Sequence, residues 1–274
     1  MRELTGKTAF VTGGASGIGL ALGRAFVEAG MKVMLADIEA DSLADAMNGL
    51  QEYGSNVRSV ACDVSNSASV RCAAQTTYEA FGNVHVVCNN AGVAASGGID
   101  NISVDCWRWV LDVNLMGVLH GIHTFLPHIR AHGEGGHIVN TASLAGLQSA
   151  SFNAYATSKY AVVAMSEGLA KELAPHGIGV SVICPSYTRT RIGDSGRNRH
   201  ERYGPTKKPD PKSRAGEWAV KHAELLQSGL DPSEIAARTL QAMRSGELYV
   251  FTHPEMNWEV EERIAAIQAA LAKA

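Results

Sequence analysis

Residues 12–19 read Thr-Gly-Gly-Ala-Ser-Gly-Ile-Gly, and this stretch decides the fold. It joins an apolar run at Thr8–Thr12 to a helical pattern at Ile18–Glu28. Glycines here permit a tight turn and let a pyrophosphate approach the free N–H groups of a helix N-terminus. The spacing departs from the common G-x-G-x-x-G, so a purely structural turn is the alternative interpretation. The residues predicted to hold a dinucleotide here are Gly13, Ala15, Ser16, Gly17, Ile18 and Gly19.

An acidic residue follows the second apolar run, where Asp37 is succeeded by Ile38 and Glu39. A carboxylate about 20 positions past the glycines accepts hydrogen bonds from an adenosine ribose. It would repel a 2′-phosphate, and neither the turn nor the neighbours of Asp37 in the sequence include Arg or Lys. The pattern predicts NAD rather than NADP, with a solvated helix cap as the alternative role of Asp37. Asp63 and Val64, after the third run, are candidates to hold the adenine, although Asp is also common in turns that lead into helices.

Short apolar runs alternate with longer helical patterns, which is typical of βαβ units and a parallel sheet. The predicted strands are Thr8–Thr12, Lys32–Ala36, Val57–Cys62, Val84–Asn89, His137–Thr141, Gly179–Cys184 and Leu248–Phe251. The predicted helices are Ile18–Glu28, Asp41–Gln51, Ser67–Phe81, Asp105–His132 and Tyr155–Ala174, with another beginning at Asp231. Right-handed crossovers then give an α/β fold, a single Rossmann-type doubly wound sheet of about seven strands flanked by helices on both faces.

The bulk composition fits a globular protein with a substantial core: 46% of residues are hydrophobic and the net charge is −3. That charge does not favour a nucleic-acid partner, and no apolar run approaches the roughly 20 residues that cross a bilayer. The N-terminus lacks the apolar region of a signal peptide, so a cytoplasmic protein is expected. Five scattered cysteines without a C-x-x-C pair suggest free thiols in a reducing compartment. The histidines show no ligand spacing, and no catalytic metal is expected.

Tyr155 and Lys159 are four positions apart in a helical pattern, so both side chains project from one face. An ammonium near a phenol favours the phenolate and lowers the tyrosine pKa, which suits a general base for an alcohol. Taken alone, such a pair is more often a surface feature.

Its context resembles the short-chain dehydrogenase/reductase family. The stretches Asn140–Gly146 (NTASLAG) and Tyr155–Lys159 (YATSK) are similar to the active-site signature of that family. The resemblance also includes Thr12–Gly19, Asn89–Gly92 (NNAG) and Asn114, and it extends over about residues 5–190 in order and spacing.

The resemblance implies a role for each matching residue. Tyr155 would be the general acid/base, Ser143 would orient the substrate oxygen, and Lys159 would hold the nicotinamide ribose and depress the Tyr155 pKa. Asn114 would anchor a water molecule that relays protons. Asn90 would pin the central strand and contact the adenosine-side ribose. Further contacts with the cofactor are expected from Ala91, Gly92, Pro185, Thr188 and Thr190.

Two departures from the family pattern concern the substrate side. Tyr155 follows Ser143 by twelve positions, one fewer than the commonest family spacing, so the connecting segment must be locally rearranged. Ser151 is a weaker candidate for the oxygen-binding serine. The usual Pro-Gly after the sixth strand is Pro185-Ser186, which predicts a narrower or more polar pocket.

The chain is expected to be one catalytic domain, 1–274, with a substrate-lid insertion at about 189–230. This region is rich in Arg, Lys, Pro and Gly with weak periodicity, and is too long for an ordinary connection. The basic run Arg189, Arg191, Arg197, Arg199 and Arg202 would meet an acidic substrate group or form a solvated lid face. The predicted substrate-facing residues are Val93 to Ser96, Leu144, Gln148, Phe152 and Tyr187. Their apolar character favours a bulky alicyclic or aromatic substrate.

The leading hypothesis is an oxidoreductase that transfers hydride between NAD and a secondary alcohol or ketone. The long insertion gives a looser resemblance to bacterial aryl-alcohol dehydrogenases of lignin-derived compounds. The alternatives are an NADP-linked carbonyl reductase and a non-catalytic NAD-binding protein. The family resemblance implies a homotetramer or homodimer, and Trp107 and Trp109 are candidates for the subunit interface or the ligand pocket.

Overall fold

The computed structural model describes residues 1–95, 102–148, 153–205, 210 and 212–273. Seven strands form one parallel sheet in the order β3-β2-β1-β4-β5-β6-β7. This confirms the predicted doubly wound sheet, and each strand ends within two residues of its predicted position. The strands are β1 (Thr8–Thr12), β2 (Lys32–Asp37), β3 (Val57–Ala61), β4 (Val86–Asn89), β5 (Gly136–Thr141), β6 (Ile178–Cys184) and β7 (Tyr249–Phe251).

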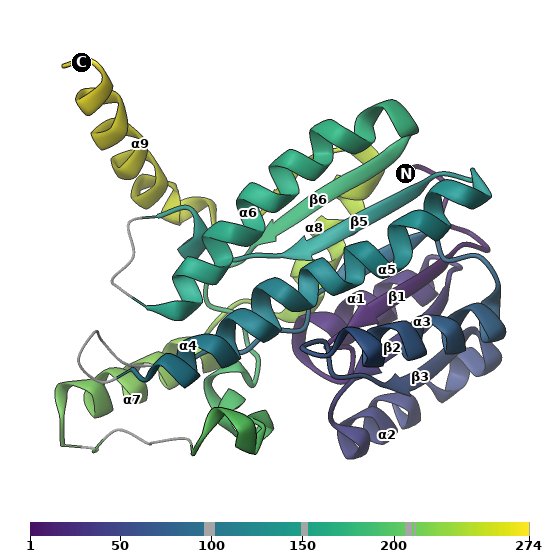
Figure 1. Ribbon diagram of the computed structural model, residues 1–274, viewed down its shortest axis with the longest axis horizontal. Coiled ribbons are helices and arrows are strands. Elements are labelled where there is room, and N and C mark those ends of the chain that lie inside the picture. The colour runs from purple at the N-terminus through teal and green to yellow at the C-terminus, as the bar shows by residue number, and fades with distance from the viewer. Residues whose placement is uncertain (96–101, 149–152, 206–209, 211, 274) are drawn as a thin grey trace.

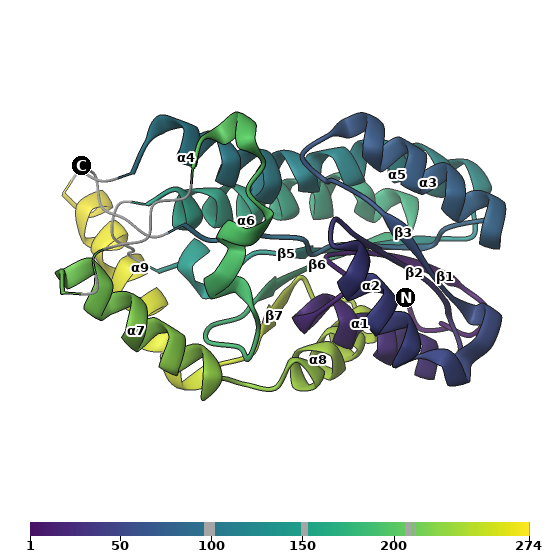
Figure 2. The same cartoon turned by 90° about the horizontal axis from the view of Figure 1, so that it is seen from below.

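Helices cover both faces of the sheet, as Figures 1 and 2 show. One face carries α3 (Ser67–Phe81), α5 (Gly117–His132) and α6 (Ala154–Leu173). The other carries α1 (Gly17–Glu28), α2 (Ala40–Asn48) and α8 (Pro232–Ser245). The start of α8 is as predicted, because the Asp231 carboxylate accepts the Ser233 N–H at 2.8 Å and Pro232 occupies the first turn.

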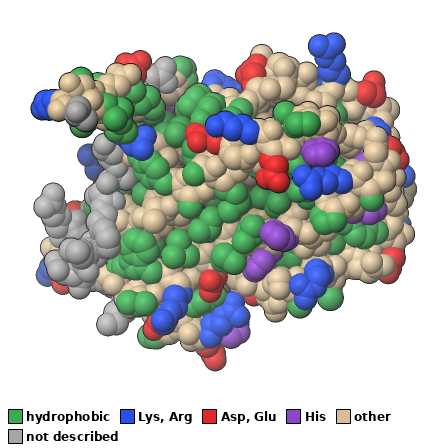
Figure 3. Space-filling model, turned by 45° about the horizontal axis from the view of Figure 1, so that its top comes forward, with side chains coloured by type: hydrophobic (Ala, Val, Ile, Leu, Met, Phe, Trp, Pro, Cys, Tyr) green, Lys and Arg blue, Asp and Glu red, His purple; other side chains and the backbone are tan. Residues whose placement is uncertain are grey.

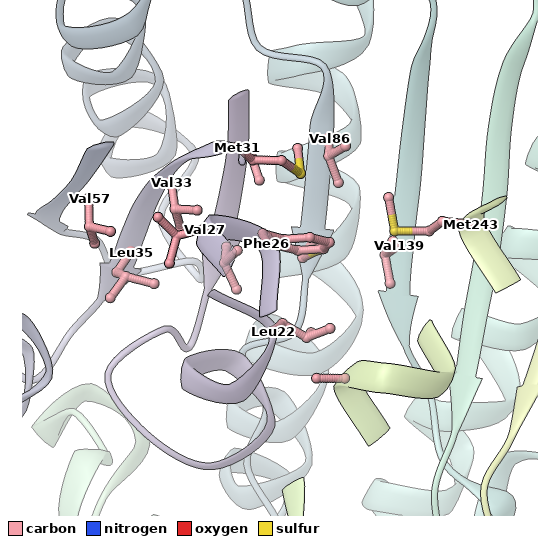
Figure 4. Close-up of a cluster of buried hydrophobic side chains, with 14 of the residues drawn as sticks. Leu22, Phe26, Val27, Met31, Val33, Leu35, Val57, Val86, Val139 and Met243 are labelled. Atoms are coloured by element: carbon pink, nitrogen blue, oxygen red, sulfur yellow. The ribbon is translucent and has the colours of Figure 1, made fainter. Parts of the chain in front are cut away.

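Alternate residues of the strands point into two separate cores, which explains their continuous apolar sequences. On one side, Leu22 and Phe26 of α1 pack with Val33 of β2 (Figure 4). On the other side, Phe10 of β1 packs against Phe125 of α5, with ring centroids 4.5 Å apart. All five side chains are fully buried.

Three helical features were not predicted. The expected helix 105–132 is divided into α4 (Val104–Leu111) and α5 by a π-helical turn at Asp112–Met116. The expected weakly periodic region contains α7 (Arg214–Gln227). A final helix, α9 (Asn257–Leu271), stands away from the body in Figure 1. None of the helices in the described part of the chain combines the length and apolar character that a membrane crossing demands.

The close approach of α5 to β4 depends on Gly121. A Cβ atom on Gly121 would lie 1.9 Å from Oδ1 of the buried Asn89 side chain. Asn89 donates to Asn140 at 2.9 Å, and Asn140 donates to Ser166 of α6 at 3.0 Å. We therefore expect Gly121→Ala to lower the free energy of unfolding by about 2 kcal/mol, because the methyl group must displace this buried network.

Gly168 of α6 provides the matched control, since a Cβ atom there meets nothing within 4 Å. Gly168→Ala is expected to be neutral or to stabilise by about 0.5 kcal/mol, because alanine loses less backbone entropy in a helix. Urea titration of the two variants measures the difference. Equal effects would contradict a packing role for Gly121.

Candidate active site

A cleft of about 1640 Å³ opens at the carboxyl ends of the strands. Ligands bind at this edge in open α/β sheets, where the strand order reverses between β1 and β4. The volume exceeds the roughly 300–1,000 Å³ of an ordinary small-molecule pocket. The cleft therefore has room for a dinucleotide and a second molecule.

The glycine-rich turn forms the floor of this cleft between β1 and α1. Gly13 and Gly17 have φ angles of +65° and +54°, which glycine adopts without strain. A Cβ atom on Gly19 would lie 2.1 Å from the Gly13 carbonyl oxygen, so the first turn of α1 packs directly on the strand exit. This arrangement leaves the N-terminus of α1 facing the cleft, as the sequence predicted.

Asp37 connects the end of β2 to the same turn. Its Oδ2 accepts the Ala15 N–H at 3.0 Å and its Oδ1 accepts the Glu39 N–H at 3.1 Å. The N-cap residue of α2 is Glu39, so Asp37 is not the helix cap that was considered as an alternative. Asp63 does serve its turn, because its Oδ1 accepts the Ser65 N–H at 2.9 Å.

A polar joint holds the ends of three strands at the cleft. The buried Thr12 hydroxyl accepts the N–H groups of Asn90 and Ala91 at 2.9 and 3.0 Å and donates to the Cys88 carbonyl. The Asn90 side chain donates to the Thr12 carbonyl at 3.0 Å and accepts from the Thr141 hydroxyl at 3.1 Å. Asn90 thus pins β1, β4 and β5 together, in agreement with the strand-pinning role implied by the family resemblance.

Ser143, Tyr155 and Lys159 meet in the cleft. Ser143 follows β5, whereas Tyr155 and Lys159 lie on the first turns of α6. The Ser143 hydroxyl donates to the Pro185 carbonyl at 3.2 Å and is close enough to the Tyr155 phenol to lower its pKa. The Lys159 ammonium donates to the Thr141 carbonyl at 2.7 Å and lies 5.5 Å from the centre of the Tyr155 ring. The short connection between Ser143 and Tyr155 therefore still brings the two residues into the same cleft.

The pKa values of the two titratable groups respond mainly to burial. Burial raises the pKa of Tyr155, and the hydrogen bond with Ser143 lowers it. The sequence predicted a depressed pKa, so the direction differs; the phenolate loses hydration, and the Lys159 ammonium is bonded to Thr141. Burial lowers the pKa of Lys159 to about 8. Thr141 takes one of its three N–H donors, and the remaining donors fit ribose hydroxyls.

Asn114 lies behind the cleft in the π-helical turn. Its Oδ1 accepts the Val93 N–H at 2.8 Å, and its Nδ2 donates to the Val93 carbonyl at 2.9 Å and to the Ser158 hydroxyl at 3.1 Å. The side chain is almost completely buried. Asn114 therefore ties the segment after β4 to α6, beside the Tyr155 and Lys159 turn.

Most of the predicted cofactor residues line the cleft. They are Gly13, Ser16, Gly17, Ile18, Asp37, Ile38, Asp63, Val64, Asn90, Ala91, Gly92, Tyr155, Lys159, Pro185, Thr188 and Thr190. Ala15, Gly19 and Asn114 are not in the lining and support it from behind, through the contacts described above.

The substrate end of the cleft is largely apolar. The predicted residues found there are Val93, Ala94, Ala95, Leu144, Gln148 and Tyr187. Ser96, Ser151 and Phe152 lie outside the described residues. Trp109, considered for the interface or the pocket, is buried and lines the cleft, and α7 adds Trp218 and His222, whose rings stack 4.6 Å apart.

The arginines of the insertion bind to the protein itself. Arg189 pairs with Asp231, and Arg202 donates to the Ser65 hydroxyl at 2.7 Å. The guanidinium of Arg199 lies 5.4 Å from the centre of the Trp109 ring.

The remaining two, Arg191 and Arg197, pair with Glu39. Sequence reasoning placed no cation near Asp37, because these partners are more than 150 residues apart and no local pattern links them.

One group of possible metal ligands, His85, His132 and Glu134, is found among the described residues, near the opposite edge of the sheet. His85 Nδ1 accepts the Thr8 N–H, which leaves Nε2 as the donor to Glu134 at 2.8 Å. His132 Nδ1 likewise accepts the Glu134 N–H, and its Nε2 donates to the Val84 carbonyl. The nitrogens of both imidazole rings are thus engaged in hydrogen bonds within the protein, so the group is a hydrogen-bond network at the amino ends of the strands.

Comparison with known proteins agrees with this geometry. A family model described as short chain dehydrogenase matches residues 7–201. The chain belongs to the short-chain dehydrogenase family.

Individual family members are similar over most of the chain. The C alpha-dehydrogenase of a Sphingobium species is 31% identical over 269 residues, covering 97% of this chain and 87% of that protein. The 3beta-hydroxysteroid dehydrogenase 2 of Eggerthella lenta is 38% identical, over 73% of this chain and 77% of that protein. A solved short-chain dehydrogenase/reductase from Burkholderia phymatum, in complex with NAD, has a TM-score of 0.93 and 38% identity, covering 98% of this chain and 97% of that chain. Hydride transfer with a nicotinamide cofactor is the activity of this family.

The low pKa of Lys159 predicts how the stability of this short-chain dehydrogenase depends on pH. Between about 8 in the folded protein and the ordinary value of 10.5, the unfolded chain holds a proton that the folded chain has released. The free energy of unfolding should therefore rise with pH across this window, relative to Lys159→Met, by on the order of 2 kcal/mol from pH 8 to pH 10. Denaturant titration of both proteins at each pH gives the difference, and the subtraction removes the other titrating groups. A difference in the free energy of unfolding that does not change with pH would contradict a lowered pKa for Lys159.

Proposed function

We propose that the protein is an NAD-dependent dehydrogenase that interconverts a secondary alcohol and a ketone. The observation that carries this proposal is the presence of Ser143 and Tyr155 in the same cleft as the glycine-rich turn and Asp37, with Ser143 near enough to lower the pKa of the Tyr155 phenol. A substrate oxygen placed against both hydroxyls would be positioned and polarised at once.

Tyr155 would take the hydroxyl proton on its phenolic oxygen during oxidation and return it during reduction. Ser143 would hold the substrate oxygen in place by hydrogen bonding. When bound, the nicotinamide supplies the hydride acceptor or donor. The apolar walls around Leu144 and Val93 would exclude water from the reacting centre.

Lys159 and Asn114 would act beside this pair. The free donors of the Lys159 ammonium would hold the nicotinamide ribose, and its charge would favour the phenolate form of Tyr155 against the effect of burial. Asn114 would keep the segment after β4 and the start of α6 in register, next to a water-mediated path for the proton.

NAD is proposed as the cofactor because the Asp37 carboxylate faces the cleft about where an adenosine ribose would bind. The similar Burkholderia phymatum structure in complex with NAD supports this choice. An NADP-linked carbonyl reductase is the second candidate, and the specific observation that favours it is the pairing of Arg191 and Arg197 with Glu39, two positions after Asp37, in the lining of the same cleft. A non-catalytic NAD-binding protein is disfavoured, because Ser143, Tyr155 and Lys159 are all present and assembled.

The substrate is proposed to be bulky and alicyclic or aromatic. Trp109, Trp218 and Tyr187 are part of the cleft lining, so the walls are rich in aromatic side chains. The name of one relative, a 3beta-hydroxysteroid dehydrogenase, indicates an alicyclic alcohol as the substrate of that protein, which supports this proposal.

We further propose that the chain acts as one catalytic domain, with residues 189–230 as its substrate lid, in a cytoplasmic homodimer or homotetramer. All five cysteines are free, as suits a reducing compartment. Hydrophobic side chains gather in a band across the face shown in Figure 3, which supports self-association.

Tyr155→Phe is expected to reduce the turnover of secondary alcohols with NAD by a factor of about 10² to 10⁴, because the proton acceptor is removed. Absorbance of reduced nicotinamide measures the rate over a panel of alicyclic and aryl alcohols. Tyr53→Phe is the matched control, since its hydroxyl bonds to Glu28 at 3.3 Å and neither residue lines the cleft. Full activity in Tyr155→Phe would rule out the proposed general base.

Asp37→Asn is expected to weaken the preference of the protein for NAD over NADP by about tenfold, because the amide does not repel a 2′-phosphate. Dissociation constants for both cofactors, from quenching of tryptophan fluorescence, give the preference. Wild-type protein that prefers NADP would overturn the proposed cofactor.

A further inference from the structure

Glu39 holds two arginines that arrive from the segment after β6. Arg197 Nη2 lies 2.5 Å from Glu39 Oε1, and Arg197 Nε lies 3.2 Å from Oε2, so the guanidinium binds the carboxylate through two nitrogens. Asn198 donates to Oε1 at 2.8 Å, and Arg191 Nη1 lies 3.8 Å from Oε2. The Glu39 carboxylate, just after β2, thus binds two arginines from a segment that begins about 150 residues later in the chain.

This ion pair lies at the adenosine end of the cleft. Glu39, Arg191 and Arg197 line the same cavity as Asp37 and Ile38. The charges of the two carboxylates, Asp37 and Glu39, and of the two guanidinium groups, Arg191 and Arg197, sum to zero. Removal of the Glu39 charge would leave a net positive rim around the position where a ribose 2′-substituent would lie.

Arginine binds phosphate and carboxylate with the same two-nitrogen geometry. A guanidinium that is already bound to a carboxylate must lose that partner before it can bind a phosphate. The pairing is also partly shielded from water, because the side chains of Glu39 and Arg197 are 19% and 23% exposed. Screening by salt is weaker for such a pair than for one on the open surface.

We infer that Glu39 is a positioning residue for cofactor selection, whose carboxylate occupies Arg191 and Arg197 and so withholds their guanidinium groups from the 2′-phosphate of NADP. The inference rests on the proposed NAD-dependent function and adds a second determinant to it. Asp37 acts by its own charge, whereas Glu39 acts through the two arginines. The bond with Arg197 lowers the pKa of Glu39 to about 2, so the carboxylate remains charged at neutral pH.

The test compares binding of 2′,5′-ADP and 5′-ADP, two probes that differ only in the 2′-phosphate. Calorimetric titration of wild type and Glu39→Gln gives the ratio of their dissociation constants without any turnover. Glu39→Gln is expected to shift this ratio toward 2′,5′-ADP by on the order of tenfold, because the released guanidinium groups gain a phosphate partner. The double variant Glu39→Gln/Arg197→Gln should lose most of that shift.

Asp231→Asn is the matched control for loosening of the same segment. It removes the ion pair with Arg189 but retains a side chain that caps α8, and Asp231 does not line the cleft. Its ratio should equal that of wild type. Arg197→Gln alone should move the ratio the other way, toward 5′-ADP, because the Glu39 carboxylate loses this partner and the rim becomes net negative. This variant gives an independent answer if Glu39→Gln does not fold.

Three results would overturn the inference: an unchanged ratio in Glu39→Gln, equal weakening of both probes, which would mean that Glu39 only fastens the segment, or a shift that persists without Arg197. A double variant that binds 2′,5′-ADP more weakly than wild type, with 5′-ADP unchanged, would mean that the arginine already binds the phosphate in wild type. Tighter binding of 2′,5′-ADP than 5′-ADP by wild type is a separate outcome, and it would overturn the proposed preference for NAD itself.

Discussion

The buried hydroxyl of Thr12 is the contact on which the cleft depends. It accepts two backbone N–H groups from the segment after β4 and is itself part of the strand that leads into the glycine-rich turn. The chain order of the sheet reverses between β1 and β4, which is where open α/β sheets form a crevice. The β1–β4 ladder ends at Val11 and Cys88, and the polar joint extends the fixed spacing to the segments beyond it. Through it Asn90 aligns the glycine-rich turn with β5, and Thr141 in turn holds Lys159.

The positions of the strands along the chain and the glycine-rich turn could be predicted because each has a local signature, and the group of Ser143, Tyr155 and Lys159 could be predicted from its resemblance to a family signature. Continuous apolar runs indicate strands that are covered on both faces, and Phe10 and Val33 indeed point into different cores. The spacing of Tyr155 and Lys159 is likewise a local property of one helix. What could not be predicted depends on long-range partners: Glu39 gives no sign in the sequence of the arginines that it binds. The helix α7, which is capped by Ser213, was also missed, because the polar region that contains it has weak helical periodicity.

Burial acts in opposite directions on the two groups that would share the proton chemistry. It disfavours the charged form of each, so the pKa of Tyr155 rises while that of Lys159 falls. The protein therefore places a weakly acidic phenol beside a weakly basic amine in a poorly hydrated site. At neutral pH the phenol is uncharged and the amine is still mainly protonated, and in so poorly hydrated a site the ionisation of both groups responds strongly to any charge that enters the cleft. Reactivity is in this way tied to occupancy of the site.

The π-helical turn at Asp112–Met116 has a consequence for how this protein can change in length. Each residue of a helix rotates the following side chains by about 100°. Deletion of one residue would convert the turn to regular α-helix and would turn the Asn114 side chain away from Val93. Insertions and deletions should therefore accumulate in the loops that flank the cleft and avoid this turn. The π-helical turn therefore limits where the chain can gain or lose residues, because the two hydrogen bonds between the Asn114 amide and Val93 depend on its length.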